Sequence, residues 1–88
     1  MPLVKLFGNL RQQSASPALN VPGVTVRGIL ETLCVGNAAL CEMIFDGDVL
    51  QAHVQVMVNG RHIDLLQGLD TPVGEADHIA IFPPIAGG

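Results

Sequence analysis

The N-terminal half of the chain contains apolar runs typical of strands and a segment with apolar residues at helical spacing. Residues 3–7 form an apolar run typical of a strand with two buried faces, and residues 18–21 can return beside it as a second strand. Thr25 precedes a segment in which apolar residues recur at helical spacing, which predicts a helix over residues 26–35. A shorter helical segment is predicted over residues 37–45.

The C-terminal half shows the alternation of half-buried strands. Residues 53–58 end at Asn59-Gly60, the dipeptide best suited to two successive positive φ angles, and residues 61–63 follow, so a tight hairpin is expected. Residues 77–82 alternate well enough for a final strand. The pattern predicts an α+β fold, a mixed sheet of about five strands with one main helix packed across it. A right-handed crossover would leave the first and last strands as parallel neighbours.

Length and composition allow one small domain. The chain has 88 residues, of which 49% are hydrophobic and 14% charged, so it has the material for a core and lacks the composition of a disordered segment. Only three aromatic residues are present, all Phe, so we expect a core of Leu, Ile and Val. We expect a domain over residues 1–82 and an extended tail over residues 83–88.

Charge, targeting signals and cysteine content narrow the class of protein further. Four basic residues and a net charge of −4 argue against binding to nucleic acid. The sequence shows neither a secretory pattern nor a long apolar run, so we expect a soluble cytoplasmic protein. Cys34 and Cys41 are too few for a disulfide scaffold, and we expect them to be thiols that act as small buried hydrophobes.

The body of the domain carries no recognisable active site. His53, His62 and His78 are spaced unlike zinc ligands, and we expect them to be solvated. Asp46 and Asp48 flank a glycine but lack the further oxygen ligands that calcium needs, so no metal site is expected. We expect no self-contained enzyme and no cofactor bound by this chain.

The unusual feature is the uncharged tail that follows the last strand. Two prolines favour an extended path away from the sheet, and two glycines leave the terminal carboxylate without flanking side chains. At about 3.3–3.6 Å per residue, six residues reach roughly 20 Å, enough to enter a narrow channel of another protein. The tail residues are Pro83, Pro84, Ile85, Ala86, Gly87 and Gly88.

A carboxylate at Gly88 suits chemistry that a partner performs. Adenylation by a partner that holds ATP and magnesium would activate this poor electrophile, and a sulfur nucleophile could then displace AMP. The product, a terminal thiocarboxylate, carries a soft anionic sulfur. An ordinary frayed terminus is the plain alternative for a Gly-Gly end, but the Phe-Pro-Pro-Ile-Ala segment before it favours the carrier interpretation.

The sequence resembles the ubiquitin-like sulfur carriers, most closely the MoaD family of molybdopterin synthase small subunits. Members end in a strand that runs into Phe-Pro-Pro-Val-x-Gly-Gly or a close variant, which residues 79–88 match almost position for position. The run of Val4-Lys5-Leu6-Phe7 followed by Leu10-Arg11, and the Asn59-Gly60 turn, are also similar. The resemblance spans the whole chain, although only the tail is specific. It implies a β-grasp (ubiquitin-like) fold.

The resemblance also implies partners and a docking surface. Gly88 would be adenylated by a MoeB-like enzyme, receive sulfur from a sulfur donor protein, and enter a MoaE-like large subunit that builds the dithiolene of molybdopterin. By position, Phe7, Arg11, His62 and Phe82 correspond to the sheet residues that such carriers offer to partners. His62 stands where an apolar residue is more usual.

The acceptor of the sulfur stays open at this point, because the acceptor site belongs to the partner. The alternatives are a ThiS-type carrier for thiamine, a carrier for a tungsten cofactor or tRNA thiolation, and a ubiquitin-like protein modifier. An inert β-grasp interaction module is a third class. The Phe-Pro-Pro-Ile-Ala segment favours molybdopterin.

Overall fold

The computed structural model describes residues 1–14 and 16–83. Strands, helices and two 3-10 turns follow one another along the chain. The elements are β1 (Leu3–Leu6), α1 (Gly8–Gln12), β2 (Ala18–Asn20), α2 (Val26–Cys34), α3 (Ala38–Ile44), β3 (Phe45–Asp46), β4 (Val49–Leu50), β5 (Gln55–Val58), β6 (Arg61–His62), η1 (Ile63–Leu65), η2 (Gly68–Asp70) and β7 (His78–Phe82).

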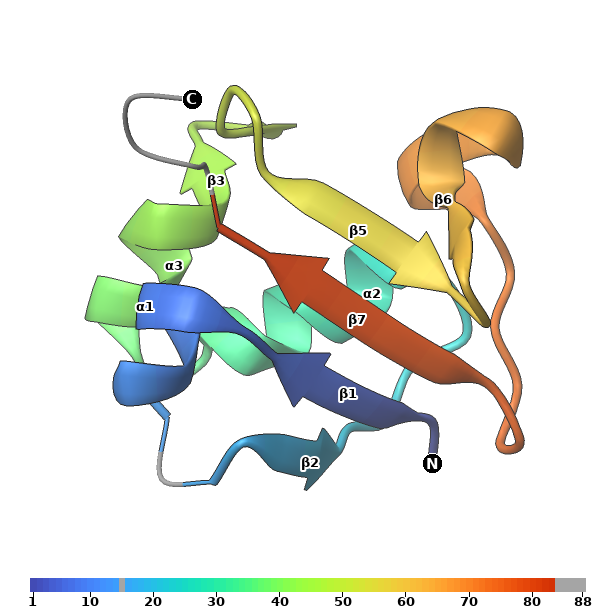
Figure 1. The fold of residues 1–88 in the computed structure, drawn as a ribbon, viewed down its shortest axis with the longest axis horizontal. Helices are drawn as coiled ribbons and strands as arrows, with labels where there is room; N and C mark the ends of the chain where they lie inside the picture. Colours follow the sequence, from blue (N-terminus) through green and yellow to red (C-terminus); the bar gives the residue numbers. More distant parts are fainter. Residues whose placement is uncertain (15, 84–88) are drawn as a thin grey trace.

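Five strands form one mixed sheet in the order β2-β1-β7-β5-β6 (Figure 1). The first and last strands, β1 and β7, lie side by side and parallel at its centre, with Val4 opposite Ile79. The other three pairings are antiparallel. The predicted central parallel pair is therefore confirmed, and it follows from the crossover through α2 and α3 between the two hairpins.

Local sequence explains the hairpin that joins β5 to β6. Asn59 and Gly60 both have positive φ angles, 52° and 82°, as the Asn-Gly pair predicted. In β5 and β7 alternate residues are buried, so each strand has one face toward the core and one face away from it.

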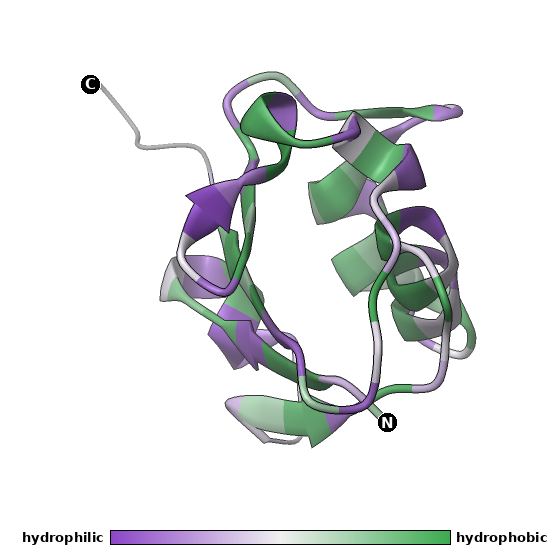
Figure 2. Cartoon of the chain, turned by 90° about the vertical axis from the view of Figure 1, so that its right-hand side faces the viewer, coloured by the Kyte–Doolittle hydropathy of each residue, from purple (hydrophilic) through white to green (hydrophobic). Residues whose placement is uncertain are grey.

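The helices form a second layer on one side of the sheet, as Figure 2 shows in side view. Helix α2 begins after Thr25, whose Oγ1 accepts a hydrogen bond from the Gly28 backbone N–H (3.1 Å). Asn37 caps α3 in the same way through the Leu40 N–H (3.1 Å). Both helix starts match the prediction, and no helix within the described residues covers the opposite face of the sheet.

The core between the two layers is aliphatic, as the composition predicted. Among the described residues no Phe is fully buried, so the aromatic rings lie at the margins of the core. The buried apolar side chains are Val4, Leu6, Leu10, Val21, Val26, Ile29, Leu30, Leu33, Leu40, Ile44, Val54, Val56, Val58, Ile63, Val73, Ile79 and Ile81.

Several short elements were not predicted. Helix α1 has one buried residue, Leu10, and no side-chain cap, so it carries almost no periodic signal. The two-residue strands β3 and β4 pair across the Asp46-Gly47-Asp48 turn, which was expected to be a solvated turn alone. The 3-10 turns η1 and η2 are three residues each, too short for a period to show.

A mixed sheet with a parallel central pair, two flanking hairpins and a main helix across one face is the β-grasp arrangement. The fold class expected from the sequence is therefore confirmed, with a second small sheet and additional short helices. No helix within residues 1–14 and 16–83 has the length and apolar character needed to cross a membrane.

Candidate functional site

Two of the three Phe residues stack on the open face of the sheet. Phe82 ends β7 on the side opposite the buried Ile81, and Phe7 follows β1 at the neighbouring position. Their rings are 4.5 Å apart, centroid to centroid, with 12° between their planes. Phe7 is 38% exposed and Phe82 is half-buried, so the pair forms an apolar surface patch of the kind that serves as an interface anchor.

The predicted tail leaves the sheet beside this patch. The Phe7 N–H donates to the carbonyl of Ile81 (3.1 Å), which extends the β1–β7 ladder to the end of β7. Pro83 then lies against Gly8, whose φ is +59°; a Cβ at Gly8 would be 2.6 Å from the Pro83 Cγ. The contact fixes the first residue of the tail next to the aromatic stack. We call Phe7, Gly8, Phe82 and Pro83 the tail root.

The other two predicted docking residues lie at different distances from the tail root. Arg11 is exposed on α1, the helix that begins directly after Phe7. His62 is on the edge strand β6, two strands away from β7, so the structure does not bring it to the stack. Its Nδ1 accepts a hydrogen bond from the Asp64 N–H (3.0 Å) and begins η1, which gives His62 a local structural role.

A row of residues on the open face joins the tail root to His62, and the sequence analysis missed it. Across the sheet, Lys5 lies opposite Ala80, Ala80 opposite Met57, and Met57 opposite His62. Lys5 is exposed, and Met57 and Ala80 are half-buried. Strand alternation could have identified these positions, because they are the neighbours of buried residues in β1, β5 and β7. We call the row of Lys5, Ala80, Met57 and His62, together with the tail root, the docking face.

The predicted tail residues beyond Pro83 lie outside the described residues. They are Pro84, Ile85, Ala86, Gly87 and Gly88. Their assignment as the working end of the molecule is therefore still a prediction.

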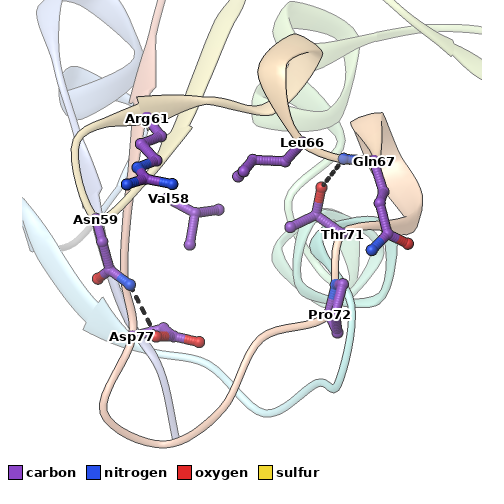
Figure 3. A pocket seen from close by; sticks show the side chains of 8 residues that line it. All are labelled: Val58, Asn59, Arg61, Leu66, Gln67, Thr71, Pro72 and Asp77. Carbon is purple, nitrogen blue, oxygen red and sulfur yellow. Dashed lines mark hydrogen bonds between the residues drawn. The ribbon is translucent and has the colours of Figure 1, made fainter.

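The pocket in Figure 3 lies at the other end of β7. It has a volume of about 680 Å³ between the β5–β6 hairpin and the loop that carries η2. Two pairs of its lining residues are hydrogen-bonded: Asn59 donates to Asp77, and the Gln67 N–H donates to the Thr71 hydroxyl (3.0 Å). Because β7 begins at this end with His78 and ends at Phe82, the pocket is separate from the tail root.

Asp77, which lines this pocket together with Arg61, accepts two hydrogen bonds through its carboxylate. Asn59 Nδ2 donates to its Oδ1 (2.8 Å) and the Gly74 N–H donates to its Oδ2 (2.7 Å). These hydrogen bonds, that from Asn59 first, lower the pKa of Asp77 below its ordinary value. Asn59 also accepts from the His78 N–H (2.9 Å), so the carboxylate helps to join the hairpin turn to the start of β7.

Replacing Asp77 with Asn should reduce the dependence of stability on acid pH. A lowered pKa means that the carboxylate stabilises the fold fully above the ordinary value of 3.8, and that this contribution is lost as the pH falls through the lower value of the folded state. Thermal unfolding midpoints of the wild type and Asp77→Asn should therefore differ at neutral pH, and the difference should shrink as the pH falls below 3.8. Asp48→Asn is the control, because the Asp48 side chain is exposed and accepts no hydrogen bond from residues 1–14 or 16–83. Equal midpoints of wild type and Asp77→Asn at neutral pH would contradict the prediction.

The two cysteines are free, as expected, and half-buried, so they are less buried than the small buried hydrophobes that the sequence predicted. Cys34 ends α2 and Cys41 lies on α3. Burial, the hydrogen bond to the Cys41 thiol and the nearby charges of Cys41 and Glu31 raise the pKa of Cys34 to about 12. Within the described part of the chain, no three His, Cys, Asp or Glu side chains gather into a group that could hold a metal ion.

Comparison with known proteins places this geometry in a family. The model of the ThiS family matches residues 4–88. Small archaeal modifier protein 3 of Haloferax volcanii is 33% identical over 64 residues, 73% of this chain and 70% of the relative. Small archaeal modifier protein 1 of the same organism is 34% identical over 88 residues, 96% of this chain and 97% of the relative.

A solved structure shows the same fold over nearly the whole chain. The solution structure of small archaeal modifier protein 1 from Methanosarcina acetivorans superposes with a TM-score of 0.87 at 34% identity, and the match covers 98% of this chain and 94% of that one. The family match, the strand order and the superposition agree on the family and the fold. This chain belongs to the ThiS family, the ubiquitin-like sulfur carriers and modifiers of β-grasp fold.

Proposed function

We propose that this chain carries sulfur as a thiocarboxylate on Gly88 and donates it to the dithiolene of molybdopterin. The observation that supports the proposal is that the tail begins within the docking face. The exposed Phe7–Phe82 stack adjoins Pro83, the residue from which the Pro-Ile-Ala-Gly-Gly segment continues. A partner that binds the stack thereby receives the tail at a defined point.

The proposed chemistry has two steps, both in a partner's active site. A MoeB-like enzyme that holds ATP and magnesium joins the Gly88 carboxylate to AMP and releases pyrophosphate. A sulfur donor protein then supplies sulfur at the oxidation level of sulfide, which attacks the acyl carbon, breaks its bond to AMP and leaves a thiocarboxylate. The chain needs no catalytic base of its own, because its contribution is to position the reacting carboxylate.

Binding to the MoaE-like large subunit is proposed to use the same docking face. The Phe7–Phe82 stack offers an apolar anchor of the kind that concentrates binding energy in interfaces. Arg11 is exposed next to it on α1, where its guanidinium can pair with a carboxylate of the partner. The half-buried Met57 and Ala80 extend the contact across the sheet.

Intact-mass measurement tests the carrier function. The purified chain is incubated with ATP, magnesium, a MoeB-like enzyme and a sulfur donor. Replacement of one oxygen by sulfur at the C-terminal residue, located by fragmentation, is the expected result. An unchanged mass with an enzyme that activates a known carrier would overturn the proposal and favour an inert interaction module.

A second candidate is conjugation of Gly88 to amines of other proteins. It is supported by the names of the relatives, two small archaeal modifier proteins that are 33% and 34% identical to this chain. The two candidates share the adenylate and differ in the group that displaces AMP. Covalent ladders on cellular proteins would favour the modifier, whereas copurification with a MoaE-like protein that converts a pterin precursor would favour molybdopterin synthesis.

A further inference from the structure

Cys34 and Cys41 lie next to each other on the helical layer, away from the docking face. Both thiols are free. Two surface hollows, of about 270 and 470 Å³, are each lined by both cysteines. The two residues are thus neighbours that a small molecule can approach from solvent, and Cys41 is close enough to contribute to the raised pKa of Cys34.

The connection between α2 and α3 holds the two cysteines in this arrangement. The Asn37 N–H donates to the carbonyl of Cys34 (3.1 Å), and the Cys41 N–H donates to the carbonyl of Asn37 (3.0 Å). Asn37 is anchored in turn, because its Nδ2 donates to the carbonyl of Gln13 (2.7 Å). The buried Leu33 and Leu40, each next to one cysteine in sequence, fix the two helices against the core.

The chemistry of the pair favours a bond between its sulfurs over a metal site. A structural metal needs about four ligands, and the described residues offer no group of three. The negative charge of a Cys41 thiolate contributes to the raised pKa of Cys34, so two thiolates at this site repel each other. Oxidation of one sulfur removes that repulsion. The first attack on an oxidant falls to Cys41, since Cys34 is held in its protonated form.

We propose that Cys34 and Cys41 form a reversible internal disulfide by exchange with a low-molecular-weight disulfide such as oxidised glutathione. The Cys41 thiolate attacks one sulfur of the glutathione disulfide, which forms a mixed disulfide and releases one glutathione thiolate. That thiolate accepts the proton of Cys34. The Cys34 sulfur then attacks the Cys41 Sγ and releases the second glutathione. Two protein thiols are oxidised by two electrons, and one glutathione disulfide is reduced to two glutathiones.

This modification site is independent of the function proposed for Gly88. The cysteines lie on α2 and α3, whereas the tail root is built from residues that follow β1 and end β7. The disulfide would link α2 and α3, the helices that pack on the sheet face opposite the docking face. We expect the yield of thiocarboxylate to be the same for the dithiol and disulfide forms.

Exposure of the folded, reduced chain to oxidised glutathione tests the proposal. We expect a product whose mass is lower by two hydrogen atoms, which carries no glutathione and no alkylatable thiol, and which dithiothreitol returns to the dithiol. A product that retains one or two glutathione adducts, or that forms dimers linked between chains, would overturn the proposal.

Matched variants separate the roles of the two sulfurs. Cys34→Ser and Cys41→Ser should each stop at a single glutathione adduct, because the resolving thiol is absent. The adduct should form faster in Cys34→Ser, which keeps Cys41, than in Cys41→Ser, because burial and the charge of Glu31 still raise the pKa of Cys34 after Cys41 is replaced. Equal rates of adduct formation would contradict the proposal that Cys41 is the first nucleophile. Closure of the wild type at the same rate in denaturant and in buffer would show that the fold does not hold the thiols together, and would likewise contradict the proposal.

Discussion

Deletion of Gly88 should abolish thiocarboxylate formation while the domain stays folded. Under the proposed function an activating enzyme needs the carboxylate in its active site, and one residue fewer shortens the reach of an extended tail by about 3.3–3.6 Å. A misplacement of only 1 Å can cost about 10²-fold in rate, so the product should fall below detection in an assay with a hundredfold range. Intact mass after incubation with ATP, a MoeB-like enzyme and a sulfur donor measures the result.

Addition of one alanine after Gly88 is a second test of the length of the tail. It should have the same effect, because the carboxylate is advanced by one residue and now follows a side chain. Stability should be unchanged in both variants, since the buried core lies within residues 4–81. A lowered unfolding midpoint in either variant would show that the terminal glycines pack against the domain. Thiocarboxylate on the shortened chain would show that Gly88 is dispensable.

Replacement of Phe82 by Ala should weaken binding to the large subunit or the activating enzyme by about 2 kcal/mol or more, roughly 30-fold in Kd. The ring is half-buried, and one of its faces stacks on Phe7, so its loss removes most of the apolar patch. Stability should fall by less than the 2–5 kcal/mol that is typical when a large core residue is replaced by Ala. Calorimetric titration measures the binding, and chemical denaturation measures the stability.

The chain provides two controls for this substitution. Phe45 is also half-buried, but it lies on β3, outside the docking face, so Phe45→Ala should leave the affinity unchanged. Ile81 is fully buried beside Phe82, so Ile81→Ala should lower stability by about 2–5 kcal/mol. If Phe82→Ala behaves like Ile81→Ala and its folded fraction binds normally, Phe82 serves the core and not the partner.

Elements with a strong local signal were predictable. The Asn59-Gly60 turn has the two positive φ angles that its residues favour, and Thr25 and Asn37 cap the two helices that follow them. The central position of β1 and β7 followed from chain order and the handedness of crossovers. The short elements α1, β3, β4, η1 and η2 were missed, because one apolar residue such as Leu10 in α1 defines no period.

The candidate site, like the fold, was predictable from the sequence only in part. Phe7 and Phe82 were identified from the sequence, but their stacking depends on the parallel register that places Leu6 opposite Ile81. His62 was grouped with them, and the structure separates it from β7 by a strand and gives its Nδ1 to the Asp64 N–H. The approach of Pro83 to Gly8 joins residues that are far apart in the chain, and no local pattern indicates it.

By itself, the sequence determined the alternation of the strands, the starts of the two main helices, the aliphatic core and the family to which the tail motif belongs. These features depend on neighbouring residues, whose backbone preferences and spacing act locally. Only the tertiary structure decided which side chains meet: the Phe7–Phe82 stack, the contact of Pro83 with Gly8, and the adjoining Cys34 and Cys41. Such contacts depend on strand register and helix packing, which arise from burial of the whole core at once.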